Sequence, residues 1–536
     1  MDVEFEKRVA KLKKIRQRKD LKLRKLKHLK ETFFTFGGDE RELKLRYYQV
    51  QGVLHLISVK RFILGDGTGL GKTLQSITAL CYLWEKNPDM KVLVLTNKSA
   101  VPQWVAEFEK FTVGIKSIIC KGTPKQRQKA YDAFNASTGP TVLVMGYRST
   151  IRDFQKLQDI KWGCVVYDEA SAFKNPKTQI HQVCRHFGEN SERTWGLTAT
   201  LIKNRLEEGW GIYQVIAPGL FHPSRTRFLN EFCVTRLQRI AGSRRQIPVV
   251  VGHRRSHIEK FREMIDPYFI GRPKHEVASE LPPLTSRTLK FPMTRAQSSL
   301  YAEALSGLLE VVDKESGERE EKEVTQLTAI AYCQQIVNHP LLIGHEGDSS
   351  KLDALMDLIT EGDLSEEKII VYSRFRSMVD IIMEKLRTKK IGAVRITGSE
   401  NEDQRKEAQD AFQDTKSSTR VICITNAATE AVNLQSAKAV VFYDTPWSAG
   451  DYLQALGRMI RIGSEHDKVY AFHLVCEDSV DERVQAVRRS KMRLIESVIG
   501  KRLKGDSDDD FEVSANNEIG DIFAALQADA RRQHGG

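Results

Sequence analysis

A glycine-rich stretch, Gly65-Asp-Gly-Thr-Gly-Leu-Gly-Lys-Thr73, ends in a lysine and a threonine. It lies between the apolar run Arg61–Leu64 and the segment Leu74–Leu80, whose apolar spacing is that of a helix. Glycine amides at a helix N-terminus can surround a phosphate, while a lysine and a hydroxyl group serve the outer phosphates and Mg²⁺. We therefore predict a nucleotide-binding P-loop, with contacts from Gly67, Thr68, Gly69, Leu70, Gly71, Lys72 and Thr73.

Two adjacent carboxylates follow a second apolar run, about 95 residues after Lys72. Adjacent carboxylates at one strand end are costly without a cation, which favours a metal ion there. We expect Asp168 to hold Mg²⁺ through water, with Thr73 as the other protein ligand, and Glu169 to orient and deprotonate the attacking water. The alternative is a pair of surface acids with no chemical role.

A glutamine about twenty residues before Lys72 is a candidate for recognition of the base. The Gln49 side chain offers a donor and an acceptor together, as the edge of adenine requires, so ATP is the expected nucleotide. Tyr47 or Tyr48 would pack nearby. A surface glutamine is the alternative reading.

A third group of candidates lies near the end of the chain, in the run Gln454-Ala-Leu-Gly-Arg-Met-Ile-Arg461. On a helix, Gln454, Arg458 and Arg461 occupy positions i, i+4 and i+7, so they project from one face. Guanidinium groups in such an arrangement can compensate the charge that develops on a γ-phosphate. The alternative is a salt-bridged surface helix.

The elements that must position these residues form two α/β series. Apolar runs that alternate with helical patterns predict parallel strands with helices between them. In the first series the predicted strands are 61–64, 92–95, 141–145, 164–168 and 194–197, and in the second they are 369–372, 393–396, 420–424, 439–443 and 469–473. Loops that follow strands, such as those after 95 and 145, are either backbone-phosphate sites or plain turns.

Composition places limits on the class of protein. The 536 residues are enough for about three or four domains of typical size, and 41% of them are hydrophobic. No apolar run approaches the ~20 residues of a membrane span, and the charged N-terminus is unlike a secretory signal. We expect an intracellular protein without a membrane partner. Eight cysteines without a Cys-x-x-Cys pair suggest reduced thiols and no zinc site.

The net charge of +13 is concentrated in parts of the chain. Residues 1–30 hold thirteen Lys/Arg against four acids, or 13 − 4 = +9. Such an arm either contacts a polyanion or forms a solvated amphipathic helix. A second basic group is either a nucleic-acid-facing insertion or a solvated loop, and it consists of Arg236, Arg239, Arg244, Arg245, Arg254 and Arg255. The acidic tail from Lys504 is expected to be flexible.

The order of these motifs resembles the SWI/SNF-type DNA-translocating ATPases within the superfamily 2 helicases. The similarity runs from about residue 41 to 500. It rests on Leu45–Gln49, Asp66–Thr73, Asp168–Ser171, Leu197–Asn204, Leu206–Trp210 and Gln454–Gly463, and on family marks outside the nucleotide site at Pro102–Trp104, Glu107–Lys110, Glu280–Pro283, Asn338–Leu342 and Lys351–Leu352.

This resemblance implies two RecA-like P-loop lobes, with parallel sheets flanked by helices and helical insertions between them. The lobes would close on ATP and Mg²⁺ and step along the backbone of double-stranded DNA, usually without separating the strands. The expected division is a basic arm (1–40), lobe 1 (41–270, with a basic insertion near 225–260), lobe 2 (271–503, with a helical insertion near 290–345) and an acidic tail (504–536). The arm or the tail could also bind protein partners.

Two departures from the family pattern bear on function. Motif II ends in Ser171 where histidine is usual, which would alter the coupling of hydrolysis to motion. Motif V is normally glycine-rich but here contains Thr429 and Glu430, which would affect its approach to DNA. The alternatives to a translocase are a strand-separating or strand-annealing helicase, and an ATP-gated DNA clamp or scaffold with weak turnover.

Overall fold

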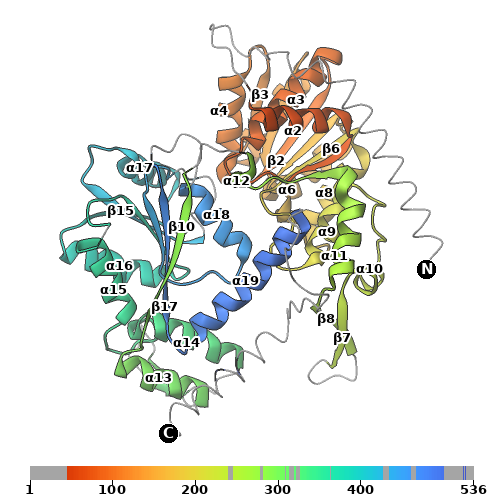
Figure 1. The fold of residues 1–536 in the computed structure, drawn as a ribbon. Coiled ribbons are helices and arrows are strands. Elements are labelled where there is room, and N and C mark those ends of the chain that lie inside the picture. Colours follow the sequence, from red (N-terminus) through yellow and green to blue (C-terminus); the bar gives the residue numbers. More distant parts are fainter. Residues whose placement is uncertain are drawn as a thin grey trace. The chain divides into compact units, whose positions relative to one another are not determined.

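A computed structural model describes most of the chain and shows two compact units (Figure 1). The described residues are 45–239, 246–277, 282–307, 309–312, 319–321, 326–362, 364–426, 432, 434–459, 466–499, 523 and 526. The first unit draws its described residues from Met1–Thr235, His253–Ser279 and Ile495–Phe511, and the second from Arg236–Gly252, Glu280–Leu494 and Glu512–Gly536.

The first unit is built on a seven-stranded sheet in the order β3-β4-β2-β5-β6-β1-β9, in which all neighbours are parallel. Its central strands are apolar on both faces, as in β2, because helices cover both sides of the sheet. The strands are β1 (Arg61–Leu64), β2 (Lys91–Thr96), β3 (Lys116–Cys120), β4 (Thr141–Gly146), β5 (Cys164–Asp168), β6 (Arg193–Leu197) and β9 (Phe269–Ile270).

The helices of this unit bury their apolar stripes against the sheet. Alternate residues of the central strands, such as Val92 and Val94, share one core with Trp84 of α3 and with Trp104 and Phe108 of α4. The helices are α2 (Tyr47–Ser58), α3 (Lys72–Lys86), α4 (Val101–Phe111), α5 (Pro124–Asn135), α6 (Tyr147–Arg152), α7 (Phe154–Leu157), α8 (Gln179–Asn190), α9 (Leu206–Ile216), α10 (Arg225–Phe232), α11 (Arg255–Ile265) and α12 (Lys274–Val277).

The predicted basic insertion includes a two-stranded sheet, β7 (Val234–Arg239) with β8 (Gln246–Gly252). It follows α10 and precedes α11 in the chain (Figure 1). Aromatic rings from α10 and α11 pack together, with Phe228 and Phe261 separated by 6.3 Å between ring centroids. Arg244 and Arg245 lie outside the described residues, so the proposed nucleic-acid contact of this insertion stays a prediction.

The second unit has a six-stranded parallel sheet in the order β10-β17-β16-β13-β15-β14. The strands are β10 (Leu284–Phe291), β13 (Ile369–Tyr372), β14 (Gly392–Ile396), β15 (Thr419–Ile424), β16 (Ala439–Phe442) and β17 (Val469–Cys476). The helices are α13 (Arg295–Ser306), α14 (Gln326–Asn338), α15 (Ser350–Thr360), α16 (Arg376–Thr388), α17 (Glu402–Gln413), α18 (Ala449–Met459) and α19 (Val480–Ile499), which begins in this unit.

The predicted fold class is confirmed, since both α/β series form parallel sheets flanked by helices. The predicted helical region after residue 290 contains α13 and α14, together with a small antiparallel pair, β11 (Glu310–Val312) and β12 (Arg319–Glu321). Three strands of the two parallel sheets were not predicted, namely β3, β9 and β10, and neither were the strands of the two small two-stranded sheets. The arm 1–40 lies outside the described residues, as does the acidic tail apart from Phe523 and Leu526.

The prediction of reduced thiols agrees with the structure, in which all eight cysteines are free and seven of them are buried. None of the helices in the described part of the chain is both long and apolar enough to cross a membrane.

Candidate nucleotide-binding site

The glycine-rich stretch forms the loop between β1 and α3. Gly69 and Gly71 have φ angles of 85° and 74°, a left-handed conformation that favours glycine. Gly71 immediately precedes the first turn of α3, and a Cβ atom there would lie 2.6 Å from Nε2 of Gln49. The loop therefore has the strand, turn and helix geometry that the sequence predicts for a P-loop.

Lys72 turns its ammonium group back into this loop. Its Nζ donates to the carbonyl of Asp66 at 2.8 Å and to the carbonyl of Gly67 at 3.4 Å. Thr73 follows in the first turn of α3 and is half-buried. A cation and a hydroxyl group thus lie beside the helix N-terminus, where the helix dipole favours an anion.

Gln49 lies on α2 and is joined to the P-loop. It is buried, and its Nε2 donates to the carbonyl of Leu70 at 3.4 Å while its Oε1 accepts from the amide of Arg46 at 2.9 Å. The hydroxyl of Tyr48 donates to the same Leu70 carbonyl at 3.3 Å. Tyr48 is buried and Tyr47 is exposed, so Tyr48 is the tyrosine that packs beside the loop.

Asp168 ends β5, two strands from β1 in the sheet. Its Oδ2 accepts from Oγ1 of Thr96 and from Nε1 of Trp104, both at 2.8 Å. Burial raises the pKa of the Asp168 carboxyl above its usual range, although the bonds from Trp104 and Thr96 act in the opposite direction. The two donors hold one oxygen of this carboxylate in a fixed place.

Glu169 has a left-handed backbone, with φ 55° and ψ 64°, which is uncommon for a residue with a side chain. Strain of this kind is typical of functional sites. Its Oε1 accepts from Oγ of Ser171 at 2.6 Å and from Oγ1 of Thr198, beyond the end of β6, at 3.5 Å. The first unit therefore brings a lysine, two carboxylates and several hydroxyls to the carboxyl ends of its strands, where open α/β sheets bind ligands.

The remaining predicted residues belong to the second unit. Gln454 and Arg458 lie on α18, as predicted. Gln454 is buried, although the spacing predicts a side chain that projects from the helix face. Nη1 of Arg458 donates to the carbonyl of Val432 at 3.3 Å. Arg461 and the motif V residues Thr429 and Glu430 lie outside the described residues.

The available protein ligands suit Mg²⁺ better than they suit a metal ion that is coordinated by side chains alone. Within the described ranges, no group of three or more His, Cys, Asp or Glu side chains could hold a metal ion. Mg²⁺ typically takes one or two carboxylates, several waters and the oxygens of a substrate phosphate. Asp168 and Thr73 offer such a partial set. The predicted ATP and Mg²⁺ therefore fit the residues that are present.

Sequence reasoning missed several residues that shape the site. Trp104, which binds Asp168, belongs to one of the family marks noted above, and that mark was its only signal. Thr96 was noted only as part of a loop after a strand. Arg272 binds Asp66 from 206 residues away in the chain, and no local pattern indicates such a contact.

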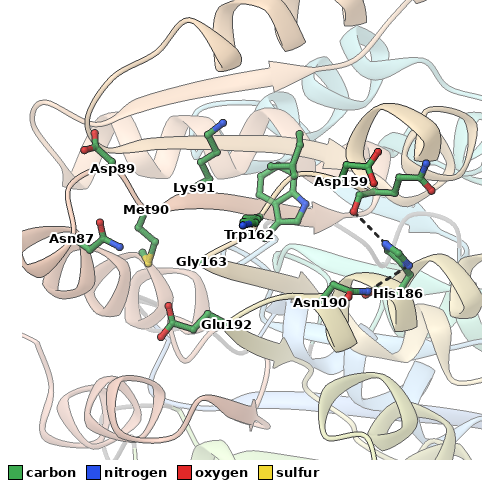
Figure 2. A pocket seen from close by; sticks show the side chains of 13 residues that line it. Asn87, Asp89, Met90, Lys91, Asp159, Trp162, Gly163, His186, Asn190 and Glu192 are labelled. Atoms are coloured by element: carbon green, nitrogen blue, oxygen red, sulfur yellow. Dashed lines mark hydrogen bonds between the residues drawn. The ribbon is translucent and has the colours of Figure 1, made fainter.

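A concave surface that encloses about 1070 Å³ lies at the other end of the strands of this sheet, away from the P-loop. Lys91 begins β2, and Gly163 and Glu192 directly precede β5 and β6, so these residues mark the amino ends of the strands (Figure 2). Charges of both signs line this surface, and His186 contacts the carbonyl of Gln158 at 3.3 Å. This surface is separate from the candidate site, because the P-loop follows the carboxyl end of β1 and this surface lies at the amino ends of the strands. Its mixed charge is also unlike that of a phosphate site.

Comparison with known proteins agrees with this geometry. The model of the SNF2-related domain matches residues 48–342, and the model of the helicase conserved C-terminal domain matches residues 350–463. The ISWI chromatin-remodeling complex ATPase ISW1 of Saccharomyces cerevisiae is 27% identical over 511 residues, which cover 90% of this chain and 43% of that protein. The nuclear protein STH1/NPS1 of the same yeast is 26% identical, with coverage of 85% and 35%.

Among solved structures, the Sulfolobus solfataricus SWI2/SNF2 ATPase core in complex with dsDNA aligns with a TM-score of 0.40 and 22% identity, covering 87% of this chain and 95% of that one. The chain spans less than half the length of the two curated relatives named above. The SNF2-related model, however, matches more than half of the 536 residues. The chain therefore belongs to the SNF2 family of helicase-like ATPases within superfamily 2, as its motifs predicted.

Proposed function

We propose that this chain is an ATP-dependent translocase on double-stranded DNA. The strongest support comes from the carboxyl ends of the strands in the first unit. There Lys72 lies inside the glycine-rich turn, Asp168 ends a strand of the same sheet, and Glu169 directly follows it. Hydrolysis there would drive closure and opening of the two units, and with it movement along DNA.

The residues of the first unit divide the work of hydrolysis. Lys72 would leave the Asp66 and Gly67 carbonyls to bind the β- and γ-phosphates, because a phosphate is the stronger partner for an ammonium group. Thr73 and Asp168 would hold Mg²⁺, which offsets the charge of the phosphates when it is bound. Glu169 would deprotonate the attacking water, with its carboxylate oriented by Ser171.

The base and the γ-phosphate would be recognised by further groups. Gln49 is assigned to the adenine edge, since its amide already lies beside the P-loop. Gln454, Arg458 and Arg461 are assigned to the γ-phosphate, where guanidinium groups would stabilise the transition state. The spacing of these three residues and the family support that assignment.

Double-stranded DNA is the proposed track. The net charge of +13 and the family favour a polyanionic partner, and contacts to the phosphate backbone predict low sequence specificity and strong salt dependence. Relatives are described as the ATPase of a chromatin-remodeling complex, so protein partners, bound through the basic arm or the acidic tail, belong to the proposal. A location inside the cell, with DNA, follows from it.

The test is steady-state ATP hydrolysis by the purified chain alone and with duplex DNA, single-stranded DNA or RNA. We expect duplex DNA to stimulate hydrolysis most and the stimulation to disappear in Glu169→Gln. Stimulation by single strands or RNA alone would instead support a conventional helicase. ATP binding without turnover on any nucleic acid would support a clamp, and either result would contradict the translocase.

A further inference from the structure

Arg272, which follows β9, binds Asp66, the residue six positions before Lys72 in the P-loop. Its Nε donates to Oδ1 of Asp66 at 2.8 Å and its Nη2 to Oδ2 at 2.6 Å. The side chains are 9% and 0% exposed, respectively, so this is a buried, two-pronged ion pair. A planar guanidinium fork matches a carboxylate in this way, and a lysine cannot reproduce it.

The same guanidinium group also contacts the two helices beside the loop. Its Nη1 donates to the carbonyl of Tyr48 on α2 at 2.5 Å, and its Nη2 lies 3.3 Å from Oε1 of Gln75 on α3. Gln75 in turn donates to Oδ2 of Asp66 at 3.1 Å. One cation thus joins the helix of the proposed adenine contact, the P-loop and the helix that follows it.

The backbone near Arg272 is bonded to the P-loop as well. The amide of Gly65 donates to the carbonyl of Ile270 at 2.6 Å, and the amide of Gly67 donates to the carbonyl of Arg272 at 3.0 Å. The approach is close enough that a Cβ atom on Gly65 would lie 2.4 Å from the ring of Phe269. Backbone and side chain therefore hold the start of the loop from the same side.

Arg272 and Lys72 both bind Asp66 and Gly67. Arg272 binds the side chain of Asp66 and the amide of Gly67, and the carbonyls of the same two residues accept the ammonium group of Lys72. A shift of Asp66 would therefore move both the loop and the resting place of the lysine. Small displacements of a binding group cost much of its function, because the group must meet its ligand in one geometry.

We propose that Arg272 is a positioning residue for nucleotide binding, which sets the shape of the P-loop and the place of Lys72 without touching the nucleotide. This inference rests on the proposed function only in that the P-loop binds ATP. It predicts that loss of the guanidinium fork weakens the binding of ATP and ADP alike, because both nucleotides place a β-phosphate in the loop.

The same unit contains a matched control for a purely structural role. Arg127 binds Asp153 with the same two-pronged geometry, at 2.6 and 3.0 Å, and with side chains 6% and 8% exposed. Its other described acceptor is the carbonyl of Gly122. Because this pair is equally buried but holds α5, a change at Arg127 tests stability without the P-loop.

The experiment compares Arg272→Lys with Arg127→Lys in the full chain. For each variant, the melting temperature, the KM for ATP, kcat, and the affinity for a fluorescent ADP analogue are measured well below the melting temperature. We expect both variants to melt earlier. Arg272→Lys alone should raise the KM for ATP and the Kd for ADP, by about tenfold or more, with a smaller change in kcat.

A wild-type KM and ADP affinity in folded Arg272→Lys would overturn the inference, as would equal changes in both variants. If Arg272→Lys does not fold, Arg272→Gln combined with Asp66→Asn removes both buried charges together and is expected to fold. Weak ADP binding in that double variant would support the inference, and wild-type binding would overturn it. Failure of the wild-type chain to bind ATP or ADP would contradict the proposed function itself.

Discussion

The two units use a buried aspartate in different ways beside a loop that follows a strand of the parallel sheet. In the first unit, Asp66 in the loop after β1 is bound by the guanidinium group of Arg272. In the second, Asp444 follows β16 and reaches the loop after the neighbouring strand β13. There it accepts from Oγ of Ser373 at 2.5 Å and from the amide of Arg374 at 2.9 Å.

The difference lies in what each aspartate binds. In the first unit a cation from within the fold, the guanidinium group of Arg272, balances the aspartate. In the second unit the aspartate itself takes up the amide and hydroxyl ahead of α16. We infer that the loop after β1 is suited to bind the phosphate of a ligand. In the loop after β13, the carboxylate of Asp444 already accepts from the groups that would bind such an anion.

Removal of the proposed base of the first unit, Glu169, should have the largest effect. Glu169→Gln should lower kcat by about 10²–10⁴-fold, because a general base contributes on that scale. The affinity for ATP should change little, since the P-loop stays intact. Single-turnover hydrolysis and ATP binding would be measured together. Near-normal turnover in the variant would show that Glu169 is not the base.

The corresponding change in the second unit should affect stability and not ATP binding. Asp444→Ala would leave Ser373, the Arg374 amide and the amide group of Asn338 without their acceptor. We expect a loss of about 3 kcal/mol in the free energy of unfolding, measured in urea. The KM for ATP of the folded variant should equal that of the wild type. A large rise in KM with unchanged stability would contradict this prediction, because Asp444 would then act in ATP binding and not in stability.

A buried histidine makes the stability of the second unit depend on pH. Burial, with Arg488 and Arg489 nearby, lowers the pKa of His473 from 6.5 to about 3. Between these values the unfolded chain binds a proton that the folded chain does not, so stability falls as pH falls below about 6.5. The contribution lost at pH 5 is about 2 kcal/mol. His473→Gln should reduce the slope of unfolding free energy against pH, and an unchanged slope would contradict this assignment.

The smallest expected effect concerns the hydroxyl that replaces the family's usual histidine. Ser171→Ala removes a donor 2.6 Å from the Glu169 carboxylate. A hydrogen bond to a charged group contributes about 1.5 kcal/mol or more, so kcat should fall about tenfold. The KM for ATP should stay the same, because Ser171 is proposed to orient the base and not the phosphates. Steady-state kinetics would measure both constants, and a rise in KM with an unchanged kcat would contradict this role of Ser171.

Much of the fold could be predicted because its central strands are covered on both faces. Strands such as β2 and β13 read as continuous apolar runs for that reason. The strands of the two parallel sheets that were missed lie at sheet edges, where side chains are partly exposed: β3 and β10 have mixed polarity, and β9 has only two residues. These three edge strands lack the apolar run by which the other strands were predicted, whereas β14, also at an edge, was predicted from Ala393-Val-Arg-Ile396.

The candidate site was predictable where its residues are neighbours in the chain. The P-loop and the Asp168–Glu169 pair are local patterns with a mechanism behind them. The contacts of Trp104 with Asp168 and of Arg272 with Asp66 join residues 64 and 206 positions apart, so only the fold reveals them. The burial of Gln454 likewise depends on tertiary packing and not on helical spacing.

Translocation is tested most directly by displacement of a third strand from a DNA triplex by the purified chain. We predict displacement from duplex DNA that requires ATP, depends on the length of duplex beside the triplex, and is absent in Glu169→Gln. Hydrolysis stimulated by duplex DNA without any displacement would contradict translocation, and displacement that does not require ATP would contradict the motor as a whole.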